Sequence, residues 1–78
     1  MGNLIGMDTM KENQAGQVEK ILLDGKIRNR LNDLGLIKGT HIECLYRNKG
    51  ISAYMIRGAV IALRAEDTAL IKIIIPES

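Results

Sequence analysis

Hydrophobic and polar residues alternate along several short stretches of this chain, which is the pattern of strands with one buried face. The clearest stretch is Thr40–Arg47. Because successive side chains of a strand point to opposite faces, its apolar and polar residues are expected on different faces. The buried face is predicted to hold Ile42, Cys44 and Tyr46, and the solvated face His41, Glu43 and Arg47.

Four further stretches are predicted to be strands because they are rich in branched apolar residues and are bounded by turn residues. They are Gln17–Leu23, Ile51–Arg57, Val60–Leu63 and Lys72–Ile75. Asn48-Lys49-Gly50 is typical of a hairpin turn, and Gly58 of another tight connection. Arg64–Leu70 is expected to form one helical turn. Residues 1–9 are interpreted as a loose lead-in to a domain that spans residues 10–76.

A short helix is predicted after the first strand, over Gly25–Leu34. Asp24 suits the N-cap position, where a short polar side chain can accept a hydrogen bond from the first helical turn. Ile27, Leu31 and Leu34 recur at i, i+4 and i+7, so they form one apolar stripe along the helix. The helix is therefore expected to bury this stripe against the strands.

The helix is predicted to end in a tight corner within Arg30–Thr40. Gly35 is expected at C′, where a left-handed backbone costs glycine little. Leu36 would then be C″ and would pack back on Leu31, the hydrophobic contact of a Schellman motif. Gly39 suits the positive-φ position of a type II turn that opens the next strand.

Five short strands, tight turns and one short helix predict a mainly β fold: a small SH3-like β-barrel with the helix inserted after strand one. An OB-like barrel is the near alternative. Closure of the barrel would protect the isoleucine-rich last strand, which as a free edge would be an aggregation hazard. Pairing of such edges also makes a homo-oligomer conceivable.

Composition limits the classes of function. The chain has 78 residues, enough for one domain, and 11 basic against 9 acidic residues give a net charge of +2. This is a solvated surface and not the basic stripe of a nucleic-acid-binding protein. The single cysteine excludes an intrachain disulfide and fits a reducing compartment. No apolar run approaches about 20 residues, and Met1–Met10 does not resemble a signal peptide, so a soluble, cytoplasmic protein without membrane insertion is expected.

Several turn and strand residues occur in an order that resembles the FeoA family, small cytoplasmic proteins of bacterial ferrous iron uptake. The matching landmarks are Gly16, Arg30-Leu31, Leu34-Gly35-Leu36, Gly39-Thr40, Arg57-Gly58 and Ile61-Ala62-Leu63-Arg64. They cover the chain from about Met10 to Ile75. Asn13 replaces a common glycine, although asparagine tolerates the same positive φ. Asn48–Ser52 also differs from the family's frequent Gly-Asp-Pro, which affects only the expected shape of that hairpin tip.

The resemblance implies an SH3-like fold and a role in iron homeostasis. It also implies a partner, the membrane transporter FeoB with its cytosolic G domain, which the small protein assists or regulates without catalysing transport. The same domain type occurs at the C-terminus of repressors resembling DtxR. A chain this short has no room for the helix-turn-helix domain of a complete repressor.

Candidate metal ligands are few. His41 and Glu43 share a strand face and can make at most a weak, incomplete site for ferrous or another divalent transition metal. Cys44 is expected on the opposite face and is interpreted as a small core residue. No cofactor is indicated. Catalysis is not expected either, because the chain lacks a GxxxxGK phosphate loop and an evident nucleophile with its base and orienting group.

Protein–protein binding is the favoured class of function. We expect the helix-to-strand corner and the Arg57-Gly58 turn to form the partner surface, because small barrels bind peptides between loops. The predicted partner-binding residues are Arg30, Leu36, Ile37, Lys38, Gly39, Arg57, Gly58 and Arg64. The alternative function is a stand-alone barrel that binds nucleic acid or a regulatory peptide outside iron transport. Nucleic acid is disfavoured because only two tyrosines are available for base stacking.

Overall fold

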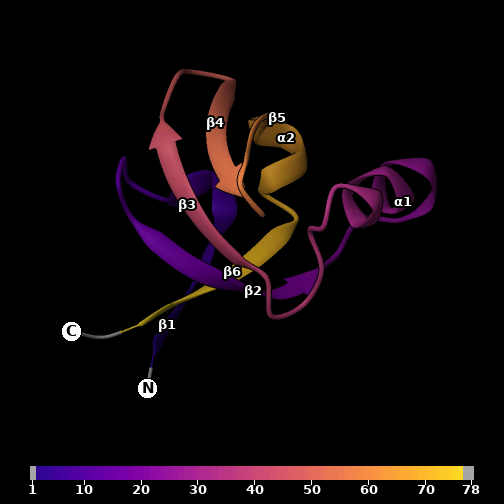
Figure 1. Ribbon diagram of the computed structural model, residues 1–78, viewed down its shortest axis with the longest axis horizontal. Helices are drawn as coiled ribbons and strands as arrows, with labels where there is room; N and C mark the ends of the chain where they lie inside the picture. Colours follow the sequence, from indigo (N-terminus) through magenta and orange to yellow (C-terminus); the bar gives the residue numbers. More distant parts are fainter. Residues whose placement is uncertain (1, 77–78) are drawn as a thin grey trace.

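The computed structural model describes residues 2–76, which form one six-stranded antiparallel sheet with two helices and a 3-10 turn (Figure 1). The strands lie in the order β1-β6-β2-β3-β4-β5. The elements along the chain are β1 (Gly2–Gly6), η1 (Met7–Thr9), β2 (Ala15–Ile21), α1 (Gly25–Asp33), β3 (His41–Tyr46), β4 (Ile51–Ile56), β5 (Ala59–Arg64), α2 (Ala65–Thr68) and β6 (Ile71–Pro76). The mainly β, SH3-like fold with a short helix is confirmed, with six strands instead of five.

The expectation of a loose N-terminal lead-in is wrong for residues 2–9. β1 pairs with β6 from Gly2 opposite Pro76 to Gly6 opposite Lys72. Met7 follows in η1 and is fully buried. The sequence Gly-Asn-Leu-Ile-Gly carries no alternation that would predict a strand. The pairing with β6 is therefore what makes these residues a strand.

The isoleucine-rich strand β6 is protected differently from the way the sequence predicts. It lies between β1 and β2 and is paired on both sides. The backbone hydrogen bonds of β6 do not depend on closure of the sheet into a barrel. The sheet is open, with β1 and β5 as its two edge strands. Figure 1 shows the start of β1 and the end of β6 at the same end of the molecule, where Gly2 pairs with Pro76.

The core is aliphatic, with one tyrosine. Its fully or nearly fully buried side chains come from every strand except β1, from α1 and η1, and from three connecting segments. They are Met7, Met10, Val18, Leu23, Leu31, Leu36, Ile42, Cys44, Tyr54, Ile56, Leu63, Ile71 and Ile73. The Tyr54 hydroxyl donates a hydrogen bond to the carbonyl oxygen of Met7 at 3.3 Å, so the core tyrosine is not left unsatisfied.

The end of α1 is the Schellman motif that the sequence predicts. Gly35 has φ of +94°, its N–H donates to Asn32 at 2.9 Å, and the Leu36 N–H donates to the carbonyl of Leu31 at 2.9 Å. Leu36 and Leu31 are both buried. At the other end, Asp24 occupies the N-cap position, but its side chain makes no capping hydrogen bond.

The prediction that Tyr46 points inward is wrong. The register of β3 against β4 shifts between Cys44 and Tyr46, so Tyr46 lies opposite Ala53. A bulge turns the strand by one residue and therefore exchanges the two faces beyond it. Tyr46 is consequently 58% exposed, whereas Cys44 is fully buried as expected.

Candidate functional site

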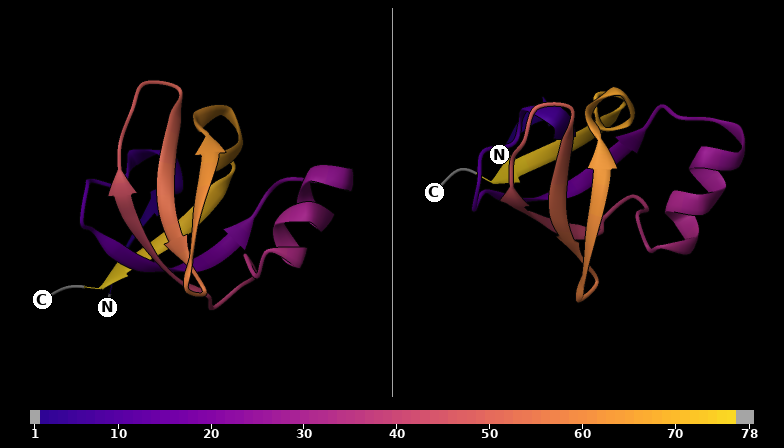
Figure 2. Two further views of the ribbon diagram at one scale, coloured as in Figure 1. Left: turned by 45° about the horizontal axis from the view of Figure 1, so that its top comes forward. Right: turned by 90° about the horizontal axis from the view of Figure 1, so that it is seen from above.

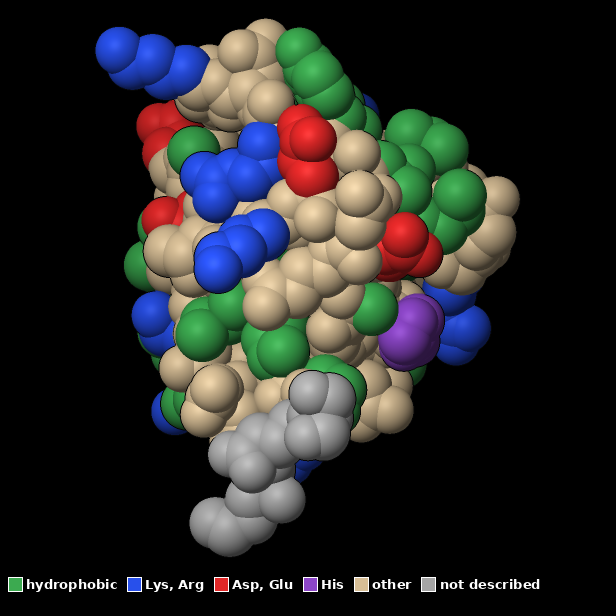
Figure 3. Space-filling model, turned by 90° about the vertical axis from the view of Figure 1, so that its left-hand side faces the viewer, with side chains coloured by type: hydrophobic (Ala, Val, Ile, Leu, Met, Phe, Trp, Pro, Cys, Tyr) green, Lys and Arg blue, Asp and Glu red, His purple; other side chains and the backbone are tan. Residues whose placement is uncertain are grey.

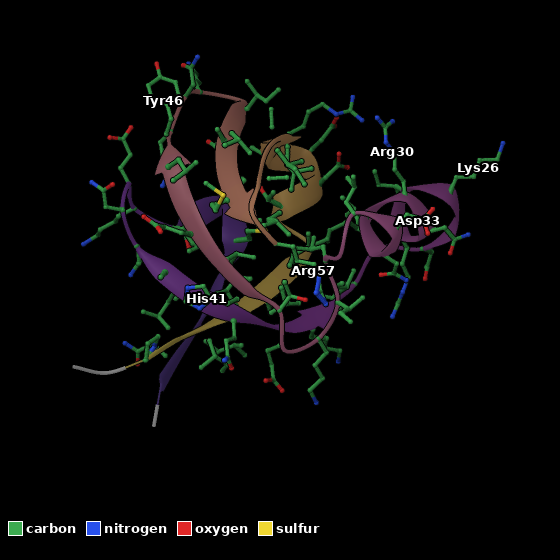
Figure 4. All side chains as sticks on the ribbon, viewed as in Figure 1. Lys26, Arg30, Asp33, His41, Tyr46 and Arg57 are labelled. Carbon is green, nitrogen blue, oxygen red and sulfur yellow. The ribbon has the colours of Figure 1, made fainter. Side chains whose placement is uncertain are left out.

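The helix-to-strand corner and the β4–β5 turn lie about twenty residues apart in the sequence and meet in one open groove of about 570 Å³. The groove lies over the outer face of β3 and β4 and between the two turns. Its lining residues are Ile37, Lys38, Gly39, Thr40, His41, Glu43, Met55, Arg57 and Gly58. We call it the Ile37 groove. Figure 4 shows Arg57 beside the chain that leaves α1 and His41 at the start of β3.

The corner that carries Ile37 is held rigidly by hydrogen bonds. The Thr40 N–H donates to the Ile37 carbonyl at 3.0 Å and closes the predicted type II turn, with Gly39 at φ of +93°. The Thr40 hydroxyl donates to the Gly35 carbonyl at 2.7 Å. The Gly39 N–H donates to Val18 at 2.7 Å and ties the turn to β2. These hydrogen bonds hold the backbone that carries Ile37, whose side chain is 45% exposed.

The opposite wall is a two-residue hairpin turn. Arg57 and Gly58 have φ of +51° and +82°, the pattern of a type I′ turn between paired Ile56 and Ala59. A positive φ is uncommon for arginine and disfavoured by its Cβ. The Arg57 side chain lies directly over Gly35, where an added Cβ would overlap Arg57 Cδ. The two walls of the groove are therefore in contact.

The charges around the groove are mixed: Lys38 and Arg57 are basic and Glu43 is acidic. The Lys38 ammonium lies 3.7 Å from a carboxylate oxygen of Glu19, and both side chains are exposed. Arg57 has no ion pair with any residue of the described range 2–76. A second hollow of about 530 Å³ lies on the far side of Ile37 and Lys38, toward α1. It is lined by Glu19, Lys20, Ile21, Arg28, Asn32, Ile37 and Lys38. Ile37 and Lys38 thus form a ridge between two hollows.

Five of the predicted partner-binding residues are brought together by the fold: Ile37, Lys38, Gly39, Arg57 and Gly58. Leu36 is not part of any surface, because it is fully buried as the C″ residue of the Schellman motif. Arg30 and Arg64 lie elsewhere, on a cleft between α1 and β5. Sequence reasoning missed Met55 as a groove residue, although its place between inward-facing Tyr54 and Ile56 marks it as outward-facing.

The candidate metal ligands do not converge. His41 and Glu43 both line the Ile37 groove, but residues 2–76 contain no group of three or more histidine, cysteine or carboxylate side chains able to hold a metal ion. Burial raises the pKa of the Cys44 thiol, and the opposing effect of Arg47 is smaller. Cys44 therefore stays a protonated core residue at neutral pH.

Within the part of the chain that is described, no helix is both long and apolar enough to cross a membrane. The family model for the FeoA domain matches residues 5–74, from β1 to β6. The chain belongs to the FeoA family. The resemblance read from its turn residues is confirmed. Membership of this family, whose members are small accessory domains that are generally not enzymes, indicates a role in ferrous iron transport.

Solved structures of FeoA proteins share the fold. The FeoA protein from Chlorobium tepidum is 21% identical, with 94% of this chain and 71% of that chain covered and a TM-score of 0.85. The FeoA-like protein from Clostridium acetobutylicum is 22% identical, with 100% and 93% covered and a TM-score of 0.84. None of the curated proteins compared with this chain matches it.

A regulatory protein contains the same fold as one of its parts. The IdeR protein of T. acidophilum is 16% identical, with 94% of this chain but only 34% of that chain covered, and a TM-score of 0.83. This FeoA-family chain thus corresponds to about a third of IdeR. At such identities the likeness establishes the fold alone.

Proposed function

We propose that this FeoA-family chain is a non-catalytic accessory protein of ferrous iron uptake. It acts in the cytoplasm by docking on the cytosolic part of a FeoB-like transporter and biasing that transporter's assembly or conformation. The docking surface is the Ile37 groove. The observation that carries this placement is the meeting of the α1–β3 corner and the Arg57-Gly58 turn around one exposed isoleucine.

Ile37 has the features of an interface anchor. It is a half-exposed apolar side chain on a hydrogen-bonded turn, with Met55 beside it and cationic side chains at the rim. A rigid apolar anchor binds with little loss of conformational entropy. Its truncation in a well-packed interface costs about 2 kcal/mol or more of binding free energy. Lys38 and Arg57 would then set orientation and association rate, as charges at an interface rim do.

The surface gives less support to nucleic-acid binding. Tyr54 is buried in the core, so Tyr46 is the one tyrosine exposed for base stacking. Basic and acidic side chains lie interleaved on the face shown in Figure 3, where no single basic field forms. Protein docking is therefore the stronger proposal.

The proposal is tested by affinity capture from detergent-solubilised membranes of the source cells, with this chain as bait and mass spectrometry as readout. A FeoB-like transporter is expected among the captured proteins. Bait with Ile37→Glu should lose it, whereas bait with Ile51→Glu should retain it. Ile51 is the matched control because it is 44% exposed, against 45% for Ile37, and lies at the other end of β4. Capture of soluble proteins or nucleic acid alone would contradict the proposal.

A further inference from the structure

The cleft that Arg30 and Arg64 line is separate from the Ile37 groove and lies between the edge strand β5 and helix α1. Its volume is about 250 Å³. One wall is four consecutive residues of β5, from Ile61 to Arg64, and the other is the apolar stripe of α1 with Arg30. The lining residues are Ile27, Arg30, Leu31, Leu34, Ile61, Ala62, Leu63, Arg64 and Asp67. Figure 2 shows α1 standing beside the end of the sheet that β5 forms. We call this the β5–α1 cleft.

The β5 wall presents unpaired backbone groups. Ile56 and Ala59 flank a two-residue turn, so the backbone N–H of each donates to the carbonyl of the other. Every second pair of opposed residues along β4 and β5 is hydrogen-bonded in the same way. The Ala65 N–H, which donates to Gly50 at 2.8 Å, follows the same alternation. The N–H and C=O groups of Val60 and Ala62 therefore point away from β4, and β5 has no further neighbour in the sheet of residues 2–76.

This edge lacks the usual protection of natural edge strands. Residues 59–63, Ala-Val-Ile-Ala-Leu, carry no charge and no proline, and Val60 is 63% exposed. Natural proteins generally place lysine, proline or a covering element on such an edge, because it is a template for another strand. Here α1 stands beside the edge and leaves the cleft open.

The walls also indicate which kind of strand fits. The β5 strand of a second copy, Ala-Val-Ile-Ala-Leu-Arg, carries an arginine and no carboxylate, so it offers no ion-pair partner to a cation in the cleft. Arg64 is already paired with Glu66 at 3.2 Å and Asp67 at 3.4 Å, whereas Arg30 has no ion pair with residues 2–76. The free cation in the cleft is therefore Arg30, and it calls for a carboxylate on the incoming segment.

We propose that the β5–α1 cleft binds an extended segment of a partner protein as an added strand on β5. The segment hydrogen-bonds the backbone of Val60 and Ala62, packs apolar side chains against Ile27 and Leu34, and places an acidic side chain against Arg30. Binding by strand addition derives affinity from main-chain hydrogen bonds and specificity from alternate side chains. The inference goes beyond the transporter role, because it does not depend on which protein supplies the segment.

The test uses the full chain and a synthetic ten-residue peptide of alternating valine and glutamate, followed by NMR of the backbone amides. The amides of Val60 and Ala62 should shift saturably and exchange with solvent at least about tenfold more slowly when the peptide is bound, as amides in a sheet do. A peptide with proline at every third position is expected to have no effect, because it cannot complete the ladder.

Two variants test the two contacts. Ala62→Pro removes the outward N–H while leaving the pairing with β4 intact, and it should weaken peptide binding by about tenfold or more. Arg30→Glu should do likewise, whereas Lys11→Glu should change binding less than about twofold, since an exposed charge far from the contact is largely screened. Lys11 carries the same charge and lies in the loop between η1 and β2, which Figure 1 shows on the opposite side of the molecule from α1.

Unchanged Val60 and Ala62 amides at saturating peptide would overturn the proposal. So would equal losses for Arg30→Glu and Lys11→Glu, which would indicate attraction by net charge alone. If these amides become protected with rising protein concentration and no peptide, the occupant is a second copy and the proposal is wrong. None of these outcomes bears on capture of the transporter through Ile37.

Discussion

The side chain of Arg57 lies on the backbone of Gly35, so closely that a Cβ at Gly35 would overlap Arg57 Cδ. This contact joins the end of α1 to the β4–β5 turn. Arg57 itself has φ of +51°, a conformation in which asparagine or glycine is more common. The relationship explains why two turns that are distant in sequence enclose one groove.

The first prediction concerns this contact. Gly35→Ala should destabilise the fold by about 2–3 kcal/mol, because a left-handed alanine costs about 1–2 kcal/mol and the overlap with Arg57 adds to it. Gly39→Ala is the matched control: φ is +93°, against +94° for Gly35, and no atom lies within 4 Å of the added Cβ. Urea unfolding gives both values.

The steric share of the effect is isolated by a double variant. Adding Arg57→Ala to Gly35→Ala should recover stability relative to Gly35→Ala alone, because the overlapping atoms are removed. Equal destabilisation by Gly35→Ala and Gly39→Ala, with no recovery, would mean that the contact is dispensable.

A second prediction follows from the buried leucine of the Schellman motif. Leu36→Ala should cost about 2–5 kcal/mol in the free energy of unfolding, since it leaves a cavity in a packed core. Leu22→Ala, at a leucine that is 44% exposed, should cost less than about 1 kcal/mol. Thermal and urea unfolding measure the difference. Similar losses at the two positions would contradict the assignment of Leu36 to the core.

The end of α1 was predictable from sequence because its geometry is local. Glycine at C′ and leucines at C3 and C″ specify the motif without distant partners, and the structure has all of its hydrogen bonds. The separate placement of Arg30 was not recognised. It lies on the i+3 position after Ile27, so its side chain lies beside the apolar stripe and lines the cleft with it.

Long-range pairing is what the sequence pattern did not specify. β1 exists because β6 offers an edge, and nothing in Gly-Asn-Leu-Ile-Gly alone reveals that edge. Tyr46 likewise follows the apolar alternation until a bulge, set by the register against β4, turns it outward. The groove was predictable as two candidate turns, but their contact depends on the order of the strands.

A third prediction concerns β1. A chain that lacks residues 1–6 should aggregate at concentrations where the full chain stays monodisperse, because the isoleucine-rich β6 becomes an exposed edge. Leu4→Lys should remain monodisperse, since Leu4 is 58% exposed and its backbone pairing with Ile74 is kept. Light scattering after size-exclusion chromatography compares them. A shortened chain that stays monodisperse and fully folded would show that β1 does not protect β6.

A fourth prediction is loss of stability at alkaline pH. Burial raises the pKa of Cys44 above its ordinary 9.0 and that of Tyr54 above its ordinary 10.0. The folded state therefore holds both protons more tightly than the unfolded state. Their contribution to the free energy of unfolding is complete below pH 9 for Cys44 and below pH 10 for Tyr54. It declines as the pH rises from each value toward the higher pKa of the folded state.

Unfolding by urea between pH 7 and 11 tests this behaviour. Tyr54→Phe should flatten the decline above pH 10, at a cost near neutral pH of about 1 kcal/mol for the lost hydrogen bond to Met7. Tyr46→Phe is the matched control near neutral pH and should cost less than about 0.5 kcal/mol, because Tyr46 is largely exposed. A slope that does not respond to Tyr54→Phe would exclude this residue as the cause.

The central claim is tested most directly by the affinity of this chain for a purified FeoB-like transporter in detergent, measured for the wild type, Ile37→Glu and Ile51→Glu. We predict saturable binding that Ile37→Glu weakens by about thirtyfold or more, as loss of an anchor worth about 2 kcal/mol requires, and that Ile51→Glu leaves within about twofold of the wild type. Absence of wild-type binding, or equal affinities for wild type and Ile37→Glu, would contradict the account.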